Sequence, residues 1–240
     1  MIIRTLGQSG YIVKSGKTEI IIDPYLSDSV NRVASRPRTL PLPVSAKELY
    51  ADAVVCTHDH LDHLDPDTVS LMKDSQLFIT TAEGKERLLS LGKNNVKTLA
   101  TGESITVGDI SLTAVFADHT VAAFGLILKA ENITLYFSGD TLYNEKLFDI
   151  SEYKPDVTFI CINGRLGNMN VEEALVTAKN IGASINVPNH YDMFESNSEN
   201  PHLFADNIAG GFIMDFNTSY ELLQNSLTPE FNKKHKSLSV

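Results

Sequence analysis

The first third of the chain carries short runs of β-branched and other apolar residues, a pattern typical of strands. Breaks that contain glycine and serine separate these runs at residues 7–10 and 15–17. Such breaks favour tight turns between neighbouring strands. We therefore expect an antiparallel meander with strands at Ile2–Leu6, Tyr11–Lys14 and Glu19–Ile22.

Beyond the meander, a stretch from Asn31 to Pro43 that contains prolines and arginines predicts an irregular loop, either near the functional site or at an oligomer contact. Helical and strand patterns then alternate along the chain. Helices are expected at Ser45–Leu49, Pro66–Lys73, Glu83–Leu91, Val171–Ile181, Pro201–Ile208 and Ser219–Asn225. Strands are expected at Ala53–Cys56, Leu77–Thr80, Val96–Leu99, Ser111–Phe116, Phe124–Lys129, Ile133–Phe137, Val157–Ile160, Ile185–Val187 and Gly211–Phe216.

This order of elements predicts an α+β protein in which mainly antiparallel strands are covered by helices. Two sheets packed face to face, with helices on their outer sides, would fit the pattern. The chain has no Gly/Ser linker, low-complexity tract or internal repeat. We therefore expect residues 1–240 to form a single domain.

Charge and composition narrow the classes of function. A formal net charge of −10 argues against a nucleic-acid partner, because proteins that bind phosphate backbones usually cluster lysine and arginine. The two cysteines, Cys56 and Cys161, lie in apolar runs and resemble core residues rather than a disulfide pair. The chain shows neither a signal-peptide pattern nor an apolar stretch of membrane-spanning length, so we expect a cytoplasmic protein with no membrane partner.

The segment His58-Asp59-His60-Leu61-Asp62-His63 concentrates three imidazoles and two carboxylates. It lies between a buried strand and a helix whose start is marked by Asp65 and Pro66. A polar solvated loop would be the ordinary interpretation of a single histidine. The density of ligand types here favours a metal site instead, and imidazole with carboxylate suits Zn²⁺, Mn²⁺ or Fe ions.

Three further groups follow apolar strands elsewhere in the chain: His119, Asp140 and His190. Taken singly, each histidine would more often be a hydrogen-bonded structural residue than a ligand. Strand-end loops on one rim of a scaffold, however, are where functional sites are usually assembled. We therefore expect these groups to share one site with the histidine cluster.

In this order of motifs the chain resembles the metallo-β-lactamase superfamily. The pattern is H-x-H-x-D-H, then a later histidine, a Gly-Asp pair and a final histidine. Within the superfamily the chain is most similar to the L-ascorbate-6-phosphate lactonase-like branch. The segments that carry this similarity are Ala53–Asp65, Phe137–Thr141, Asn163–Arg165, Gly167–Met169 and Pro188–Phe194.

The resemblance implies a four-layer αββα sandwich of two mixed sheets with a metal site between the sheet edges. It implies two divalent ions, zinc or manganese, although a single ion stays open. Asp62 and Asp140 would be catalytic, and Asp62 could alternatively orient the attacking water or accept its proton if only one ion is bound. The implied ligands are His58, His60 and His119 for one ion, Asp62, His63 and His190 for the other, and Asp140 as a bridge.

Substrate-binding candidates lie in loops that follow the later strands. Arg165 could bind a phosphate or carboxylate through its guanidinium group, or it could brace its loop. Asn168 could position substrate or stabilise a turn, and Tyr191 follows the last histidine ligand. Asp23, at a strand end, is expected to support a ligand or form a turn rather than bind metal.

Together these features predict a metal-dependent hydrolase. A metal-activated water would open a lactone, or cleave another ester, in a small anionic substrate such as a sugar-acid phosphate lactone. One alternative is a phosphodiesterase acting on a small phosphodiester. The other is a binding or sensing protein that keeps the metal without turnover.

Overall fold

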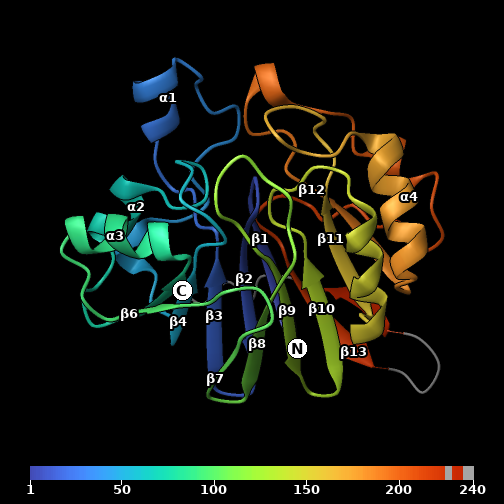
Figure 1. Ribbon diagram of the computed structural model, residues 1–240, viewed down its shortest axis with the longest axis horizontal. Coiled ribbons are helices and arrows are strands. Elements are labelled where there is room, and N and C mark those ends of the chain that lie inside the picture. The colour runs from blue at the N-terminus through green and yellow to red at the C-terminus, as the bar shows by residue number, and fades with distance from the viewer. Residues whose placement is uncertain (225–228, 235–240) are drawn as a thin grey trace.

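The computed structural model describes residues 1–224 and 229–234, and its strands form two mixed sheets (Figure 1). The larger sheet contains, in spatial order, β14 (Pro229–Lys233), β13 (Ser219–Gln224), β1 (Ile2–Gly7), β2 (Gly10–Ser15), β3 (Thr18–Ile22), β4 (Ala53–Val55), β5 (Leu77–Thr80) and β6 (Val96–Thr98). The smaller sheet contains β12 (Ile185–Asn189), β11 (Val157–Cys161), β10 (Ile133–Phe137), β9 (Gly125–Ala130), β8 (Ile110–Val115) and β7 (Ser104–Val107).

Helices cover the outer side of each sheet (Figure 1). The larger sheet is covered by η1 (Ala46–Glu48), α2 (Pro66–Leu71) and α3 (Ala82–Ser90). The smaller sheet is covered by η2 (Glu145–Tyr153), α4 (Val171–Ile181) and α5 (His202–Ala205). Two short helices, α1 (Ser29–Ala34) and η3 (Glu195–Asn197), lie in loops. The predicted αββα sandwich is confirmed. Among the described residues, none of the helices has the length and apolar character that a membrane span requires.

The main core lies between the two sheets. The rings of Phe137 and Phe159 stack there with centroids 4.4 Å apart, and the Tyr11 ring from the larger sheet packs against both. Burial of such aromatic surface is the dominant stabilising contribution in a sandwich of this kind. The core therefore fixes how the strand ends of one sheet face those of the other.

Local sequence explains how the chain passes from β4 into the site. Every residue of β4 is fully buried, because parallel neighbours flank the strand and apolar residues cover both of its faces. The helix α2 begins where the sequence predicts, since the Asp65 carboxylate accepts a hydrogen bond from the Asp67 amide and Pro66 occupies the first turn. The ligand-rich loop is thus held between a rigid strand and a capped helix.

The structure corrects two predictions near the C-terminus. The helix predicted from Ser219 is wrong, because Ser219–Gln224 forms β13, pairing with β1 on one side and β14 on the other. Tyr220 and Leu222 are buried in the core between the sheets, so long-range pairing overrides the local helical pattern. Asn225 lies outside the described residues. The strand predicted at Gly211–Phe216 is also wrong, since only Gly211 forms a bridge, to Asn186.

Other elements were not expected from the sequence. Residues 29–34 form α1, which overlaps the start of the stretch from Asn31 to Pro43 that was predicted as an irregular loop, and η2 covers part of the smaller sheet. The edge strands β7 and β14 were also missed. Their residues are largely polar or only partly buried, and a pattern without a continuous apolar face gives a weak strand signal.

Replacement of Phe159 by alanine should lower the free energy of unfolding by about 3–5 kcal/mol, because it removes a fully buried ring from the stacked pair. Urea denaturation followed by circular dichroism measures this change. Val176→Ala is the matched control, since Val176 is 43% exposed on α4 and its loss should cost less than about 0.5 kcal/mol. Equal losses in the two variants would contradict the assignment of the main core.

Candidate metal centre

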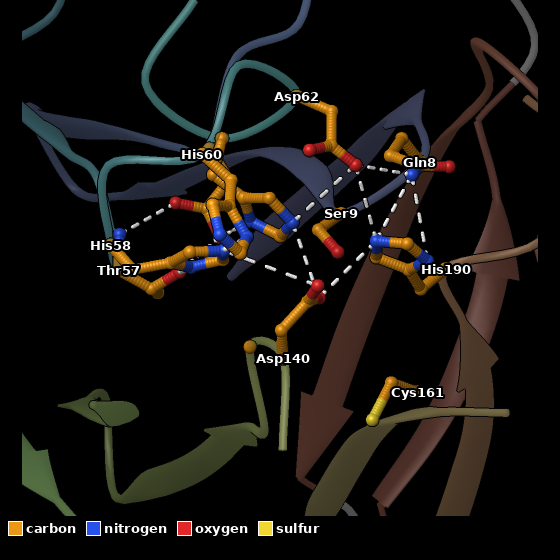
Figure 2. Close-up of polar contacts among 12 residues, drawn as sticks. Gln8, Ser9, Thr57, His58, His60, Asp62, Asp140, Cys161 and His190 are labelled. Atoms are coloured by element: carbon orange, nitrogen blue, oxygen red, sulfur yellow. Dashed lines mark hydrogen bonds and ion pairs between the residues drawn. The ribbon is translucent and has the colours of Figure 1, made fainter. Parts of the chain in front are cut away.

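The seven side chains predicted as metal ligands meet where strands of the two sheets end. Figure 2 labels five of them: His58, His60, Asp62, Asp140 and His190. The segment 58–63 follows β4 of the larger sheet. The other three residues come from the smaller sheet: His119 from the β8–β9 loop, Asp140 after β10 and His190 after β12. The structure thus brings all seven residues together, and their role as ligands stays a prediction.

The side chains form two groups, and in each group the potential ligand atoms lie within 4.8 Å of one another. The first group contains His58, His60, His119 and Asp140, and the second contains Asp62, His63 and His190. This is the division that the family resemblance implied. Each group offers nitrogen and oxygen atoms only, which suits zinc, manganese or iron.

Asp140 lies between the two groups. One carboxylate oxygen, Oδ1, is 3.1 Å from His63 Nε2 and 3.2 Å from His190 Nε2. The other oxygen, Oδ2, faces the first group at 3.8 Å from His119 Nε2 and 4.0 Å from His58 Nε2. A carboxylate in this position can bridge two cations.

Hydrogen bonds behind the first group orient its imidazoles. The His119 Nδ1–H points at the Gly167 carbonyl oxygen, 3.0 Å away, which leaves Nε2 free to face the site. The Thr57 hydroxyl donates to Asp23 and lies 3.1 Å from His58 Nδ1, so it can accept the proton of that nitrogen. His58 Nε2 and His119 Nε2 then lie 3.1 and 3.2 Å from His60 Nδ1. These three nitrogen atoms thus lie close enough together to bind one ion.

Asp23 orients the second group in the same way. Its carboxylate accepts hydrogen bonds from the Thr57 amide and hydroxyl at 2.7 Å each and lies 2.8 Å from His63 Nδ1. The remaining ring nitrogen, Nε2, therefore points into the site. The expectation that Asp23 supports a ligand agrees with this geometry.

The electrostatics of the site favour a bound cation. Burial alone would lower the pKa of His63 and His190, but Asp140 and the other nearby carboxylates outweigh it. They hold the pKa of His63 well above its usual value and raise the pKa of His190 to about 9. Burial instead dominates for His58, whose pKa is lowered. Nearby positive charge therefore stabilises the buried carboxylates, and either protons or metal ions can supply it.

Two buried atoms at the centre test whether a metal fits. His63 Nε2 and Asp140 Oδ1 are buried and form no hydrogen bond within the described chain, although they lie 3.1 Å apart. Without a proton or a metal ion between them, these two groups would be unpaired at a cost of about 1–3 kcal/mol each. A metal ion between them would satisfy both, so the residues fit the group that the fold implies.

An open pocket of about 500 Å³ lies over the two groups of ligands. His60, Asp62, Asp140 and His190 contribute to its lining. The predicted substrate residues do not. The Arg165 guanidinium donates to the Ser198 carbonyl at 3.0 Å, and Tyr191 lines a separate cavity of about 50 Å³. Asn168 is buried, and neither atom of its amide has a partner in the described chain.

Sequence reasoning missed three residues at the site. Arg36 and Asn197 line the pocket. Gln8 lies in the turn between β1 and β2, where its Nε2 donates to Asp62 Oδ2 at 2.7 Å and approaches His190 Nε2 at 3.0 Å (Figure 2). The sequence signal at Gln8 was only that of a turn, because its polar contacts depend on segments more than fifty residues away.

The chain matches the model of the beta-lactamase superfamily domain over residues 18–191. It belongs to the metallo-β-lactamase superfamily. A UPF0173 metal-dependent hydrolase of Shouchella clausii is 28% identical over an alignment of 221 positions, which covers 85% of this chain and 92% of that protein.

Two solved structures share the fold. A possible metal-dependent hydrolase from Veillonella parvula superposes with a TM-score of 0.79 at 18% identity, covering 91% of this chain and 98% of that one. The isothiocyanate hydrolase from Delia radicum gut bacteria gives a TM-score of 0.76 at 20% identity, again covering 91% and 98%. Because the chain belongs to this superfamily and its relatives are named metal-dependent hydrolases, we describe it as a metal-dependent hydrolase. The alternative of a sensing protein without turnover is set aside.

Asp23→Asn should weaken metal binding about 10-fold to 100-fold, because the neutral amide no longer holds the His63 ring as a charged acceptor. Competition with a chromogenic chelator, using Zn²⁺ and Mn²⁺ separately, measures the affinity. Asp109→Asn removes the same charge from an exposed turn and should leave the affinity unchanged. Equal affinities in both variants and the wild type would contradict the supporting role of Asp23.

Gly167→Ala should disturb the first group of ligands. An added Cβ would lie 2.9 Å from the His119 ring, and the backbone φ of +92° also disfavours alanine. Gly102→Ala is a close control, because Gly102 has the same φ of +92° but open space around it. We expect weaker metal binding in the first variant only. A similar affinity in both variants would show that the His119 ring can move without loss.

Proposed function

We propose that this hydrolase opens a lactone, or cleaves another ester bond, in a small anionic molecule with the help of zinc or manganese. The observation that carries the proposal is the position of Asp140, whose two oxygens face two groups of ligands at the floor of an open pocket. A small-molecule pocket is typically 300–1,000 Å³, as a general order of magnitude, and this one lies within that range.

A bound metal would lower the pKa of a water molecule and polarise the carbonyl group of the substrate. The side chains of the protein must hold that water and accept its proton. Asp62 suits this role because its side chain lines the pocket and is 18% exposed, whereas that of Asp140 is only 5% exposed. Burial alone would raise the pKa of Asp62, but His63 and His190 lower it below the usual value, so the carboxylate is ionised at neutral pH.

Gln8 positions Asp62 for this task. Its amide donates to Asp62 Oδ2, the same oxygen that lies 3.3 Å from His190 Nε2. The other oxygen of Asp62 has no hydrogen-bond partner among the described residues and can accept from water or substrate. The carboxylate is therefore oriented on one side and available on the other.

The resemblance to the L-ascorbate-6-phosphate lactonase-like branch supports a lactone as the substrate, and a sugar-acid phosphate lactone is one candidate. Because the fold is similar to that of an isothiocyanate hydrolase, isothiocyanates, which also contain an electrophilic carbon, should be assayed as well. Phosphodiesters belong in the same panel, since a cluster that stabilises a carboxyl-ester transition state can also stabilise a phosphoryl one.

The direct test is turnover of a panel of lactones, carboxyl esters, isothiocyanates and phosphodiesters by zinc- and manganese-loaded protein. Removal of metal by a chelator should abolish turnover, and adding either ion back should restore it. Asp62→Asn should lower kcat about 10²-fold to 10⁴-fold while metal content is measured in parallel. Asp109→Asn serves as the control for loss of one carboxylate.

Two results would contradict the proposal. The first is a phosphodiester or isothiocyanate turned over faster than every lactone and ester in the panel. The second is full turnover by Asp62→Asn on the best ester substrate, because this result would show that Asp62 does not accept the proton of the attacking water.

A further inference from the structure

The segment that contains α1 lies apart from the helices that cover the two sheets (Figure 1). Two of its residues, Val30 and Arg36, line the pocket. The Thr39 amide donates to the Met193 carbonyl at 2.8 Å, and Arg38 forms a bridge with Phe194. Residues 29–39 are thus fastened to the loop that follows the last histidine ligand. This attachment places the segment at the mouth of the pocket, where side chains from both partners line it.

Two arginines in this segment have different surroundings. Arg38 donates to the carbonyl groups of Tyr25, Ser27 and Leu40, and its guanidinium carbon lies 5.1 Å from the centre of the Tyr25 ring. It therefore braces the segment. Arg36 is half-buried and lines the pocket, yet it forms no hydrogen bond or salt bridge with any described residue.

Among the described residues that line the pocket over the predicted ligands, Arg36 is the only lysine or arginine. The nearby acidic residue, Glu195, shares an adjoining cavity of about 220 Å³ with Arg36 but forms no salt bridge with it. Asn197 lines the pocket as well, and its Oδ1 already accepts a hydrogen bond from Asn163. The amide nitrogen of Asn197 is therefore the group it can offer to a ligand.

The remaining wall of the pocket contains apolar side chains, Val30, Leu61 and Leu166. A substrate that fills the pocket would place its carbon skeleton against them. A guanidinium group with free donors binds carboxylate or phosphate oxygens in a bidentate manner. In a chain with a net charge of −10, such a local cation also offsets the repulsion that an anionic substrate meets on approach.

We infer that Arg36 recognises a carboxylate or phosphate on the substrate, remote from the bond that is hydrolysed, with the Asn197 amide as a second donor. This inference rests on the proposed function and deepens it. Arg36, rather than the predicted Arg165, is then the residue that determines the preference for anionic substrates.

Three lactones of similar size test the inference: gluconolactone, which is neutral, glucarolactone, which carries a carboxylate, and 6-phosphogluconolactone, which carries a phosphate. Arg36→Ala should raise KM for at least one of the two anionic lactones about 10-fold to 100-fold, leaving kcat within about 3-fold, because it removes charge-assisted hydrogen bonds. KM for gluconolactone should not change. For Arg36→Lys we expect a KM between those of the wild type and Arg36→Ala, because lysine keeps the charge but not the bidentate geometry.

Arg32→Ala is the matched control. Arg32 belongs to α1 and carries the same charge, but it forms a salt bridge with Asp67 and does not line the pocket. Its removal should leave KM for all three lactones unchanged. Metal content and thermal unfolding of each variant establish that the site is intact.

Titration calorimetry with the ring-opened acids gives a readout that does not depend on turnover. Gluconate, glucarate and 6-phosphogluconate share one carboxylate, and only the last two carry a second anionic group. The wild type should bind at least one of these two about 10-fold more tightly than gluconate. Arg36→Ala should lose this preference, and Arg32→Ala should keep it. The tighter of the two acids identifies carboxylate or phosphate as the recognised group.

The outcomes separate this inference from the proposed function. If neither these lactones nor the carboxyl esters of the wider panel are hydrolysed but the binding preference depends on Arg36, the proposed reaction is wrong and the anion site stands. If the lactones are hydrolysed and Arg36→Ala keeps the wild-type preference in both assays, the reaction stands and the role of Arg36 is wrong. A wild type without any preference for the dianionic acids or anionic lactones would also overturn the inference.

Discussion

The buried carboxylate of Asp140 is the group on which the whole site depends. A carboxylate taken out of water must be paired, and the protein surrounds this one with four imidazoles from three different loops. That requirement explains why the strand ends of both sheets converge at one place. Gly139 permits this approach, because it has a φ of +57° and packs closely against Thr57, which follows β4 of the larger sheet.

A second layer of contacts makes the arrangement rigid. Thr57 and Asp23 connect the ends of β4 and β3 to His58 and His63, so that one small network sets the orientation of a histidine in each group. Rigid placement of this kind matters for hydrolysis, because metal ligands and a proton acceptor must keep their relative positions while substrate binds and product leaves. The pocket above is built instead from loops, where substrate preference can vary without disturbing the ligands.

The sequence was sufficient for the features that local pattern encodes. The cluster at 58–63 follows a buried strand, and His119, Asp140 and His190 each follow a strand, so their convergence could be anticipated. The roles of Arg36 and Arg38 could not, because two arginines separated by one residue look alike until the carbonyl groups around each are known. The sequence also left open whether Arg165 binds substrate or braces its loop, and its hydrogen bond to the Ser198 carbonyl agrees with the bracing alternative. Ser219–Gln224 shows the parallel limit for the backbone, where pairing with β1 decides the conformation.

The division of the ligands between the sheets has a consequence for the life of the protein in a cell. An ion bound by the predicted ligands from both sheets would join the N-terminal half of the chain to the C-terminal half, and it could do so only in the folded state. Binding linkage then makes the folded fraction rise with the concentration of free metal. Starvation for the metal would therefore shorten the half-life of the protein through proteolysis, in addition to silencing it.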